Sequence, residues 1–325
     1  MSDIQRKILG IVTGRKGGNT ELLLRHALKA CKEDGCEVEM IRLTDFNIKP
    51  CTGCLACVLR PSAGLPRKCV QKDDGEFVLE KILHCDGLIL SVPNMDLMPH
   101  APIINLCNRS FVINERARYL REPGTEPEYP KVAATIGLGG SDWTQFHMPI
   151  LNLCAIWLTG ARNMLVDQMM VQHFETTGLV SLFEEYTTRA EQLGHHVCQE
   201  LGKDEGEFTY HGSDVPEACP ICHCDALILR EGKLVCPLCN VAGIPIMENG
   251  KIRSISWEAG VERSHWSKFG KLDHDVNTDW YIRRDEQGKK IYENHELERI
   301  KEQRELLKDV VTPTLPPSKA AERKE

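Results

Sequence analysis

The sequence contains no long apolar run. No window of the 325-residue chain approaches the ~20 consecutive apolar residues that a membrane-spanning helix needs. The amino terminus reaches only a short apolar stretch and then glycines, without the hydrophobic core and small-residue cleavage site of an export signal. We therefore expect a cytoplasmic protein with no membrane partner.

An excess of positive charge is also missing. The chain has 40 lysines and arginines against 47 aspartates and glutamates, which gives a formal net charge of -7. No global positive field exists to hold a polyanion, so nucleic acid is not an expected partner. Hydrophobic residues make up 42% and charged residues 27% of the chain, which is ordinary for a folded globular protein and excludes wholesale disorder.

Cysteine, by contrast, is abundant. Because thiols are kept reduced inside cells, 15 cysteines without an export signal favour metal ligands or redox chemistry over disulfides. Nine of them fall within two spaced clusters, at 51–69 and 219–239. Most of the others lie in apolar helical contexts, where a free cysteine usually behaves as a small buried hydrophobe.

The first two hundred residues alternate short apolar runs with amphipathic segments, the signature of parallel strands joined by crossover helices. The run GLILSVP is continuously apolar, as a strand covered on both faces requires. The pattern predicts a doubly wound, flavodoxin-like α/β fold with five parallel strands in the order 2-1-3-4-5. The strands are expected at 7–14, 37–43, 87–93, 131–139 and 163–171, and the helices at 19–34, capped by Asn19 and Thr20, 74–85, 101–116, 144–160 and 181–201.

The rest of the chain divides into two further parts. We expect the flavodoxin-like domain to span 1–205, and a polar linker with a short metal-binding hairpin unit to span 206–256. A C-terminal extension, 257–325, would hold a charged helix near 294–309 and a Pro-rich tail.

A glycine-rich loop, TGRKGGNT at 13–20, follows the first strand and opens the first helix. Backbone N–H groups and the helix dipole favour an anionic phosphate at such a point, and the glycines allow close backbone approach. The pattern is neither the dinucleotide GxGxxG nor a Walker loop, so FMN fits better than NAD or ATP. A plain strand-to-helix turn is the alternative, but the loops at 91–102 and 137–143 end neighbouring strands at the same rim.

The first cysteine cluster is C-x-x-C-x-x-C. One tight loop can aim the thiolates of Cys51, Cys54 and Cys57 inward, with Cys69 as the natural fourth ligand. An iron-sulfur cluster needs about four cysteine thiolates in such a compact arrangement, so the spacing predicts one here. A zinc site is a minor alternative.

These residues together resemble the iron-sulfur flavoproteins of the NADPH-dependent FMN reductase superfamily. The resemblance covers about residues 7 to 200 and rests on KILGIVTGRKGGNTELLLRHAL, on PCTGCLAC with KDDGEFVLEKILHCDGLILSVP, and on APIINLCNR. It implies FMN, a [4Fe-4S] cluster, a homodimer or homotetramer, and electron transfer from NAD(P)H or a ferredoxin-like reduced carrier to a small acceptor.

The resemblance also assigns residues to these cofactors. Flavin-binding residues would be Thr13, Arg15, Gly18, Asn19 and Thr20 at the phosphate and Pro93, Asn94, Met95, Gly139 and Gly140 near the ring, with Cys51, Cys54, Cys57 and Cys69 on the cluster. The chain departs from the family in three places. Family members often have Ser-Pro-Arg or Ser-Gly-Arg at 13–15 and an aromatic residue near 94–95. Eleven residues separate Cys57 from Cys69 here, whereas the gap in the family is usually about half as long.

The second cluster is a pair of Cys-x-x-Cys motifs, Cys219 with Cys222 and Cys236 with Cys239, separated by thirteen residues that contain a Glu-Gly turn. Two such motifs joined by a β-hairpin place four sulfurs tetrahedrally, which predicts a closed structural zinc site resembling a zinc ribbon. A single iron in a rubredoxin-like module is the alternative. Cys224 is poorly placed for the same tetrahedron.

No catalytic acid can be named from spacing. His100, His147 and His173, with Asp96 and Asp142, lie near the predicted rim, where most such residues serve the surface or the packing. The expected function is an FMN-dependent oxidoreductase with an iron-sulfur cluster. The alternatives are an electron-transfer or redox-sensing protein that acts on a partner protein, and a structural scaffold that binds only zinc.

Overall fold

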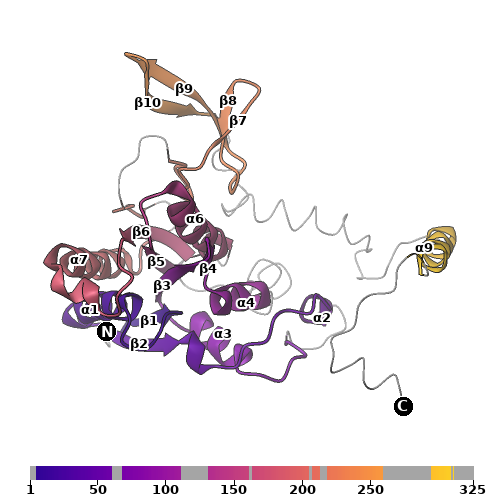
Figure 1. The fold of residues 1–325 in the computed structure, drawn as a ribbon, viewed down its shortest axis with the longest axis horizontal. Helices are drawn as coiled ribbons and strands as arrows, with labels where there is room; N and C mark the ends of the chain where they lie inside the picture. The colour runs from indigo at the N-terminus through magenta and orange to yellow at the C-terminus, as the bar shows by residue number, and fades with distance from the viewer. Residues whose placement is uncertain are drawn as a thin grey trace. The chain divides into compact units, whose positions relative to one another are not determined.

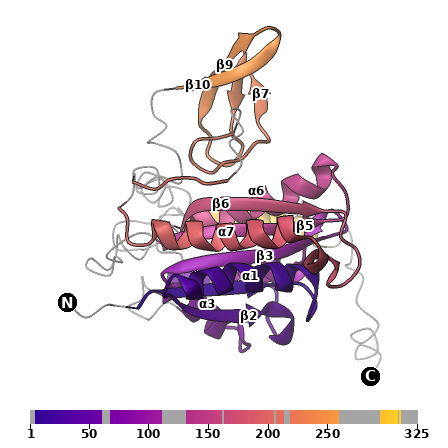
Figure 2. The ribbon, with the colours of Figure 1, turned by 90° about the vertical axis from the view of Figure 1, so that its left-hand side faces the viewer.

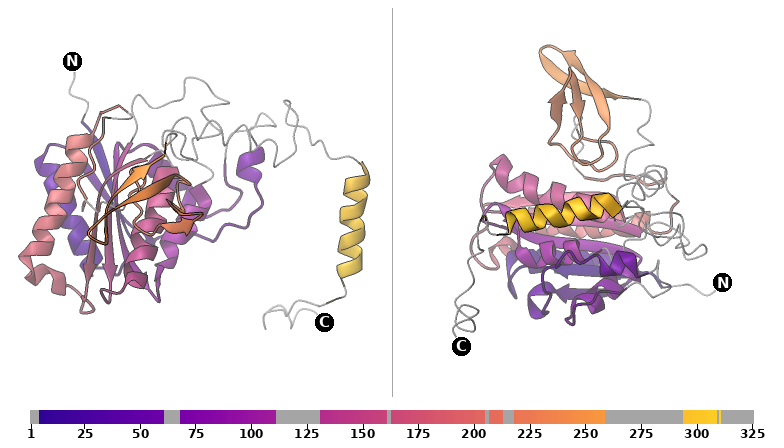
Figure 3. Two further views of the ribbon diagram at one scale, coloured as in Figure 1. Left: turned by 90° about the horizontal axis from the view of Figure 1, so that it is seen from above. Right: turned by 90° about the vertical axis from the view of Figure 1, so that its right-hand side faces the viewer.

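The computed structural model describes residues 5–60, 68–110, 131–160, 163–204, 207–212, 218–258, 294–308 and 310 (Figure 1). The chain forms two compact units, Met1–Asp275 and Val276–Glu325. The first unit holds a parallel sheet with its helices and a smaller antiparallel sheet. In the second unit, the described residues form the helix α9 (Asn294–Leu307), yellow in Figure 3, and the turn after it.

The central sheet has the predicted strand order. Its five parallel strands run in the order β2-β1-β3-β5-β6, and the added two-residue strand β4 (Met98–Pro99) pairs antiparallel with the end of β3. On β3, successive residues face opposite sides of the sheet: Leu88 and Leu90 enter one core, and Ile89 enters the other. The parallel strands are β1 (Lys7–Val12), β2 (Glu37–Arg42), β3 (Gly87–Met95), β5 (Lys131–Gly139) and β6 (Asn163–Gln172).

Helices cover both faces of this sheet. On one face α1 (Asn19–Glu33) and α7 (Glu184–Glu200) lie side by side, as Figure 2 shows. They pack so closely that a Cβ on Gly194 would lie 2.2 Å from the carbonyl oxygen of Ala27. The opposite core is formed with α3 (Gly75–Leu83), α4 (Ala101–Arg109) and α6 (Thr144–Gly160).

The start of α1 differs from the prediction. Gly18 is the N-cap, and no side chain makes a capping hydrogen bond, whereas Asn19 and Thr20 were expected to cap the helix. The reason is that the Asn19 amide is held by carbonyls of a distant loop. The helix expected at 181–201 also starts later than predicted. It is α7, which begins at Glu184 because a 3-10 turn, η4 (Leu179–Leu182), precedes it. Residues 111–116 of the helix expected at 101–116 lie outside the described part.

The antiparallel sheet has four strands, where one hairpin was expected. Its order is β10-β9-β8-β7, which makes two hairpins in sequence. Each tight turn has two residues with positive φ, Glu231 with Gly232 and Asn249 with Gly250, as a type I′ turn requires. The strands are β7 (Ile228–Arg230), β8 (Lys233–Val235), β9 (Ala242–Glu248) and β10 (Lys251–Trp257).

Most of the predicted C-terminal extension, 259–293 and the tail 311–325, lies outside the described residues. The described helix α9 begins where the charged helix was predicted and ends two residues earlier. Among the described helices, none is long and apolar enough to cross a membrane.

Candidate functional site

A pocket of about 250 Å³ lies at the carboxyl ends of the parallel strands, where ligands bind in open α/β sheets. Nine of the ten residues predicted to bind a flavin line it; Thr13 does not. The structure therefore brings the three predicted loops to one pocket. The lining residues are Gly14, Arg15, Gly18, Asn19, Thr20, Pro93, Asn94, Met95, Leu138, Gly139, Gly140, Phe174, Glu175 and Thr177.

The glycine-rich loop is tightly wound against the start of α1. The Gly18 amide donates to the Arg15 carbonyl at 3.0 Å, and Gly17 has a φ of 66°. A Cβ on Gly14 would lie 2.1 Å from Thr20 Oγ1, so any larger residue there would force Thr20 to move. Because no side chain caps α1, the amides of its first turn remain available to an anion at the positive end of the helix dipole.

Thr13 lies beneath this loop, fully buried at the end of β1. Its amide donates to the Ser91 carbonyl at 3.2 Å, and its carbonyl accepts a hydrogen bond from His100 Nδ1 at 2.5 Å. His100 thus fixes the strand end. The Thr13 hydroxyl is buried without a hydrogen-bond partner among the described residues, and together with the uncapped amides it suits a phosphate oxygen.

The loop after β6 completes the pocket. The Asn19 amide donates to the carbonyls of Phe174 and Thr176 at 3.1 and 2.9 Å, and its oxygen accepts from Val180 N at 3.2 Å. Asn19 therefore holds this loop with its side chain instead of offering it to a ligand. Phe174, Glu175 and Thr177 were missed in the sequence, although their position after the fifth parallel strand was the available signal.

A buried acid supports the glycine-rich loop from behind. Glu21 is 3% exposed, and its carboxylate accepts from Arg42 at 2.7 Å, from Arg25 at 2.8 Å and from the Gly17 amide at 3.3 Å. Burial alone would raise the pKa of Glu21, but the hydrogen bonds from Arg42 and Arg25 outweigh it and lower the pKa. Arg15 reaches across the pocket mouth, where its guanidinium donates to Thr177 Oγ1 at 3.2 Å.

The other polar residues near the rim have structural partners or lie in turns. Asp96 has positive φ in the turn between β3 and β4, and His173 has positive φ after β6. Asp142 accepts a hydrogen bond from Ser141 at 3.3 Å, and His147 pairs with Asp225 at 3.2 Å. None of these contacts forms a nucleophile with a base, so no catalytic acid is named.

The first cysteine cluster lies on a loop that follows β2. Cys51 and Cys54 are exposed, while Cys57, on the short helix α2 (Ala56–Leu59), and Cys69 are partly buried. Hydrogen bonds from the Ala56 backbone and the Thr52 side chain lower the pKa of Cys54, which favours its thiolate. Residues 61–67 lie outside the described part, and within the described chain no three of these four sulfurs are close enough for a single ion.

The second cysteine cluster is gathered at one point. The sulfurs of Cys219, Cys222, Cys236 and Cys239 lie within 4.8 Å of one another, and all four residues are buried. Cys224 is also buried but lies outside this group, and its sulfur is 3.8 Å from the Ala226 carbonyl oxygen. The arrangement suits one tetrahedral ion.

The two Cys-x-x-Cys turns have the same backbone form. The His223 amide donates to the Cys219 carbonyl, and the Asn240 amide donates to the Cys236 carbonyl, each at 2.9 Å. Both donors have positive φ, 58° for His223 and 57° for Asn240. The second turn also points an amide at a sulfur, since Cys239 N lies 3.4 Å from Cys236 Sγ.

This four-cysteine module contacts the larger domain through side-chain pairs. The His223 ring stacks on Tyr210, with ring centroids 3.5 Å apart, and Asp225 accepts from Asn152 of α6 at 3.4 Å. Next to Tyr210, the His211 amide donates to the Val166 carbonyl of β6 at 2.7 Å. The module is thereby joined to α6 and, through the 207–212 segment, to β6.

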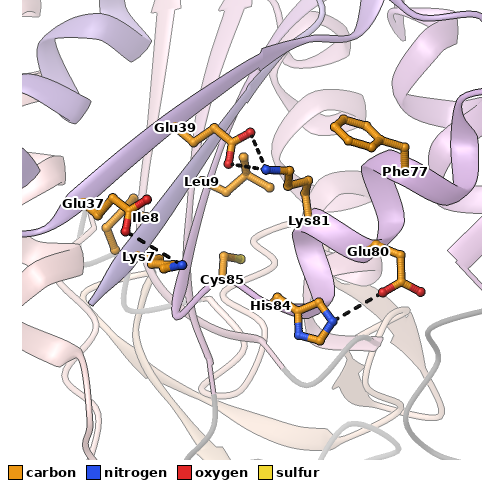
Figure 4. A pocket seen from close by; sticks show the side chains of 10 residues that line it. All are labelled: Lys7, Ile8, Leu9, Glu37, Glu39, Phe77, Glu80, Lys81, His84 and Cys85. Atoms are coloured by element: carbon orange, nitrogen blue, oxygen red, sulfur yellow. Dashed lines mark hydrogen bonds and ion pairs between the residues drawn. The ribbon is translucent and has the colours of Figure 1, made fainter. Parts of the chain in front are cut away.

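A second pocket, of about 350 Å³, opens at the amino ends of β1 and β2, opposite the first (Figure 4). Its charged side chains pair with one another: Lys81 with Glu39 at 3.0 Å, and His84 with Glu80 at 3.3 Å. Burial raises the pKa of Cys85 at its wall to about 11, so that thiol is a poor nucleophile. No predicted site residue lies in this pocket.

Two comparisons of sequence decide the family. Residues 6–161 match the model of the NADPH-dependent FMN reductase family. An iron-sulfur flavoprotein from Methanosarcina thermophila is 30% identical over 155 residues, which is 43% of this chain and 74% of that protein. The chain belongs to the NADPH-dependent FMN reductase family. It is therefore an FMN-dependent oxidoreductase with a flavodoxin-like fold.

Two further relatives extend the likeness along the chain. The flavone synthase cfoJ of Aspergillus candidus is 26% identical over 297 residues, covering 82% of this family member and 87% of that protein. A solved structure of a flavone reductase superposes with a TM-score of 0.69 at 24% identity and covers 95% of this chain and 99% of its own. The likeness to the flavone reductase structure shows the fold alone.

Proposed function

We propose that this chain binds FMN in the pocket at the strand ends and passes electrons from NAD(P)H or another reduced carrier to a small acceptor. The observation that carries the proposal is the uncapped start of α1, beside which the buried Thr13 hydroxyl has no hydrogen-bond partner among the described residues. Both features are costly unless an anion is bound there. The size and place of the pocket fit a flavin nucleotide better than a dinucleotide.

The chain's own residues would divide the binding of FMN between two ends. At the phosphate end, Arg15, Thr20 and the first amides of α1 would act as donors, while Gly18 and Asn19 shape the loop. The buried Thr13 hydroxyl beneath the loop would be a further donor. FMN supplies one-electron and two-electron redox chemistry when it is bound. Around the ring, the loops that end β3 and β5 would exclude water and orient the acceptor through Pro93, Asn94, Met95, Gly139 and Gly140.

We also propose a [4Fe-4S] cluster on the loop at 51–69, held by Cys51, Cys54, Cys57 and Cys69. A cubane is wider than a single ion, so its ligand sulfurs lie farther apart than those around zinc. The lowered pKa of Cys54 favours the thiolate that iron binds. The name of the archaeal relative, an iron-sulfur flavoprotein, supports the same cofactor.

For the four-cysteine module we propose structural zinc, with a single rubredoxin-type iron as the alternative. Its four cysteine residues are at most 1% exposed, so an ion held there has no open position for a substrate. The flavin domain, the linker with the four-cysteine module, and the C-terminal extension would follow the divisions 1–205, 206–256 and 257–325. We expect a homodimer or homotetramer.

The acceptor is proposed to be a flat conjugated ketone of the flavonoid class. The fungal relative is named a flavone synthase, and its match of 82% of this chain extends beyond the flavin domain. Near the proposed ring site the pocket is lined by Met95, Leu138 and Phe174, which offer apolar contact to a flat molecule.

A second candidate is an electron-transfer or redox-sensing protein with no small substrate. It is favoured by the exposure of Cys51 and Cys54, because a cluster at that loop would face a docking partner. Sustained oxidation of NAD(P)H with small acceptors would argue against this candidate.

The FMN site is tested with Arg15→Ala. Loss of a charged donor to phosphate is expected to weaken FMN binding about 10- to 100-fold, measured by fluorescence quenching of FMN titrated with apoprotein. Lys16→Ala is the matched control, because Lys16 is an adjacent exposed cation that does not line the pocket. Equal FMN affinity of the two variants would refute the phosphate site.

A further inference from the structure

The loop that carries the first cysteine cluster is closed at its neck by a ladder of hydrogen bonds. Where the chain enters the loop, the Asn47 amide donates to the Asp74 carboxylate at 2.8 Å, and the Asp74 amide donates back to the Asn47 carbonyl at 3.0 Å. One step closer to the cysteines, the Gln71 side chain donates to the Pro50 carbonyl at 2.7 Å. The entering and leaving segments are therefore held side by side, next to Cys51 and Cys69.

Arg109, the last residue of α4, lies at the centre of this neck. Its guanidinium makes two hydrogen bonds to the Asp73 carboxylate, at 2.7 and 3.0 Å, and a third to the Lys49 carbonyl at 3.0 Å. The same carboxylate accepts the Lys49 amide at 2.9 Å. One arginine from a core helix thus binds both ends of the cysteine loop.

The pair is buried, since the side chains of Arg109 and Asp73 are 1% and 0% exposed. The hydrogen bond from Arg109 lowers the pKa of Asp73 to about 2, so both groups are charged at neutral pH. Charges interact strongly in such surroundings, because water screens them little. The Arg109 position is consequently fixed, and α4 cannot move without disturbing the loop.

Arg109 also faces the predicted cluster. Its hydrogen bonds to Asp73 raise the pKa of Arg109, and the nearby Cys69 raises that pKa further. Its Nε is buried with no hydrogen-bond partner among the described residues. A buried guanidinium, paired with Asp73, therefore lies at the neck of the loop near Cys69.

We propose that Arg109 is the positioning residue of the iron-sulfur site: it brings Cys69 into place as the fourth ligand and sets the reduction potential of the cluster. The inference rests on the proposed cluster. Reduction adds one electron to an already anionic cluster, so a fixed cation beside a ligand sulfur favours the reduced state and raises the potential. Arg109 acts through the neck of the cysteine loop and not on the electron acceptor, and so is not a catalytic residue.

The test uses the full chain, purified without oxygen, with the change Arg109→Gln. The equilibrium of the cluster with a one-electron reductant is expected to shift about tenfold towards the oxidised state, equivalent to about 59 mV, while the flavin potential and the FMN content stay unchanged. Arg109→Gln leaves Asp73 as an unpaired buried charge, which would itself lower the potential. The double variant Arg109→Gln with Asp73→Asn removes both charges, so the shift is expected in the same direction but smaller. Arg109→Lys, which keeps the charge, should retain most of the potential.

Arg189→Gln is the matched control. Arg189 of α7 also pairs with a fully buried aspartate, Asp167, but that pair lies on β6 and α7, away from the cysteine loop. A cluster potential that moves no more in either Arg109 variant than in this control would overturn the inference. A wild-type chain that binds no iron would instead overturn the proposed cluster, so the two failures are distinguishable.

Discussion

Replacing Cys236 by serine is expected to remove the metal from the four-cysteine module and to unfold residues 218–258. Strands β7 and β8 have three residues each, and the buried centre of the module is largely the cysteines themselves. Metal binding supplies roughly 10–16 kcal/mol to the folding of comparable zinc peptides, far more than so few apolar contacts can replace. Elemental analysis should show one metal ion fewer per chain, and limited proteolysis should cut within the module.

Cys224→Ser is the control for this change. Cys224 is fully buried in the same module but lies outside the group of four sulfurs. The variant should keep its metal and resist proteolysis like the wild type. Metal loss in Cys224→Ser together with retention in Cys236→Ser would contradict the assigned ligand set.

Replacing Cys54 by alanine is expected to abolish the iron-sulfur cluster and to leave FMN in place. The cluster needs about four thiolates, whereas no cysteine lines the flavin pocket. Iron should fall from about four to near zero per chain, apart from any iron in the second site, and the broad absorption near ~400 nm should disappear. Flavin content, measured after release by heat, should stay within about a tenth of the wild-type value.

The matched control for that variant is Cys85→Ala. Cys85 is a buried thiol that donates to the Ile82 carbonyl at 3.2 Å and lies near the amino end of β3, away from the loop at 51–69. It should keep the full iron content. Equal iron in the two variants would mean that Cys54 binds no cluster.

The local pattern of apolar residues was sufficient to predict the main sheet. Continuous apolar runs at β1, β3 and β5 predicted buried parallel strands, because both faces of the sheet are covered. The two-residue β4 was missed, since no periodicity exists over so short a segment. The second hairpin was also missed, although Asn249-Gly250 is the usual signal of a tight type I′ turn.

Side-chain roles that depend on distant partners could not be predicted. Asn19 follows a glycine-rich loop and so resembled a helix cap or a phosphate donor, but its amide binds carbonyls 155 and 157 residues away. Arg109 is one of 40 basic residues, and nothing local distinguishes it. Its role emerges only when folding places it between Lys49 and Asp73.

The most direct test of the account is the visible spectrum and metal content of the chain purified without oxygen. We predict one FMN, about four irons and one zinc per chain, with flavin bands above a broad absorption near ~400 nm that bleaches on reduction. A colourless chain that contains zinc alone would contradict the account and leave a flavodoxin-like scaffold with a structural metal.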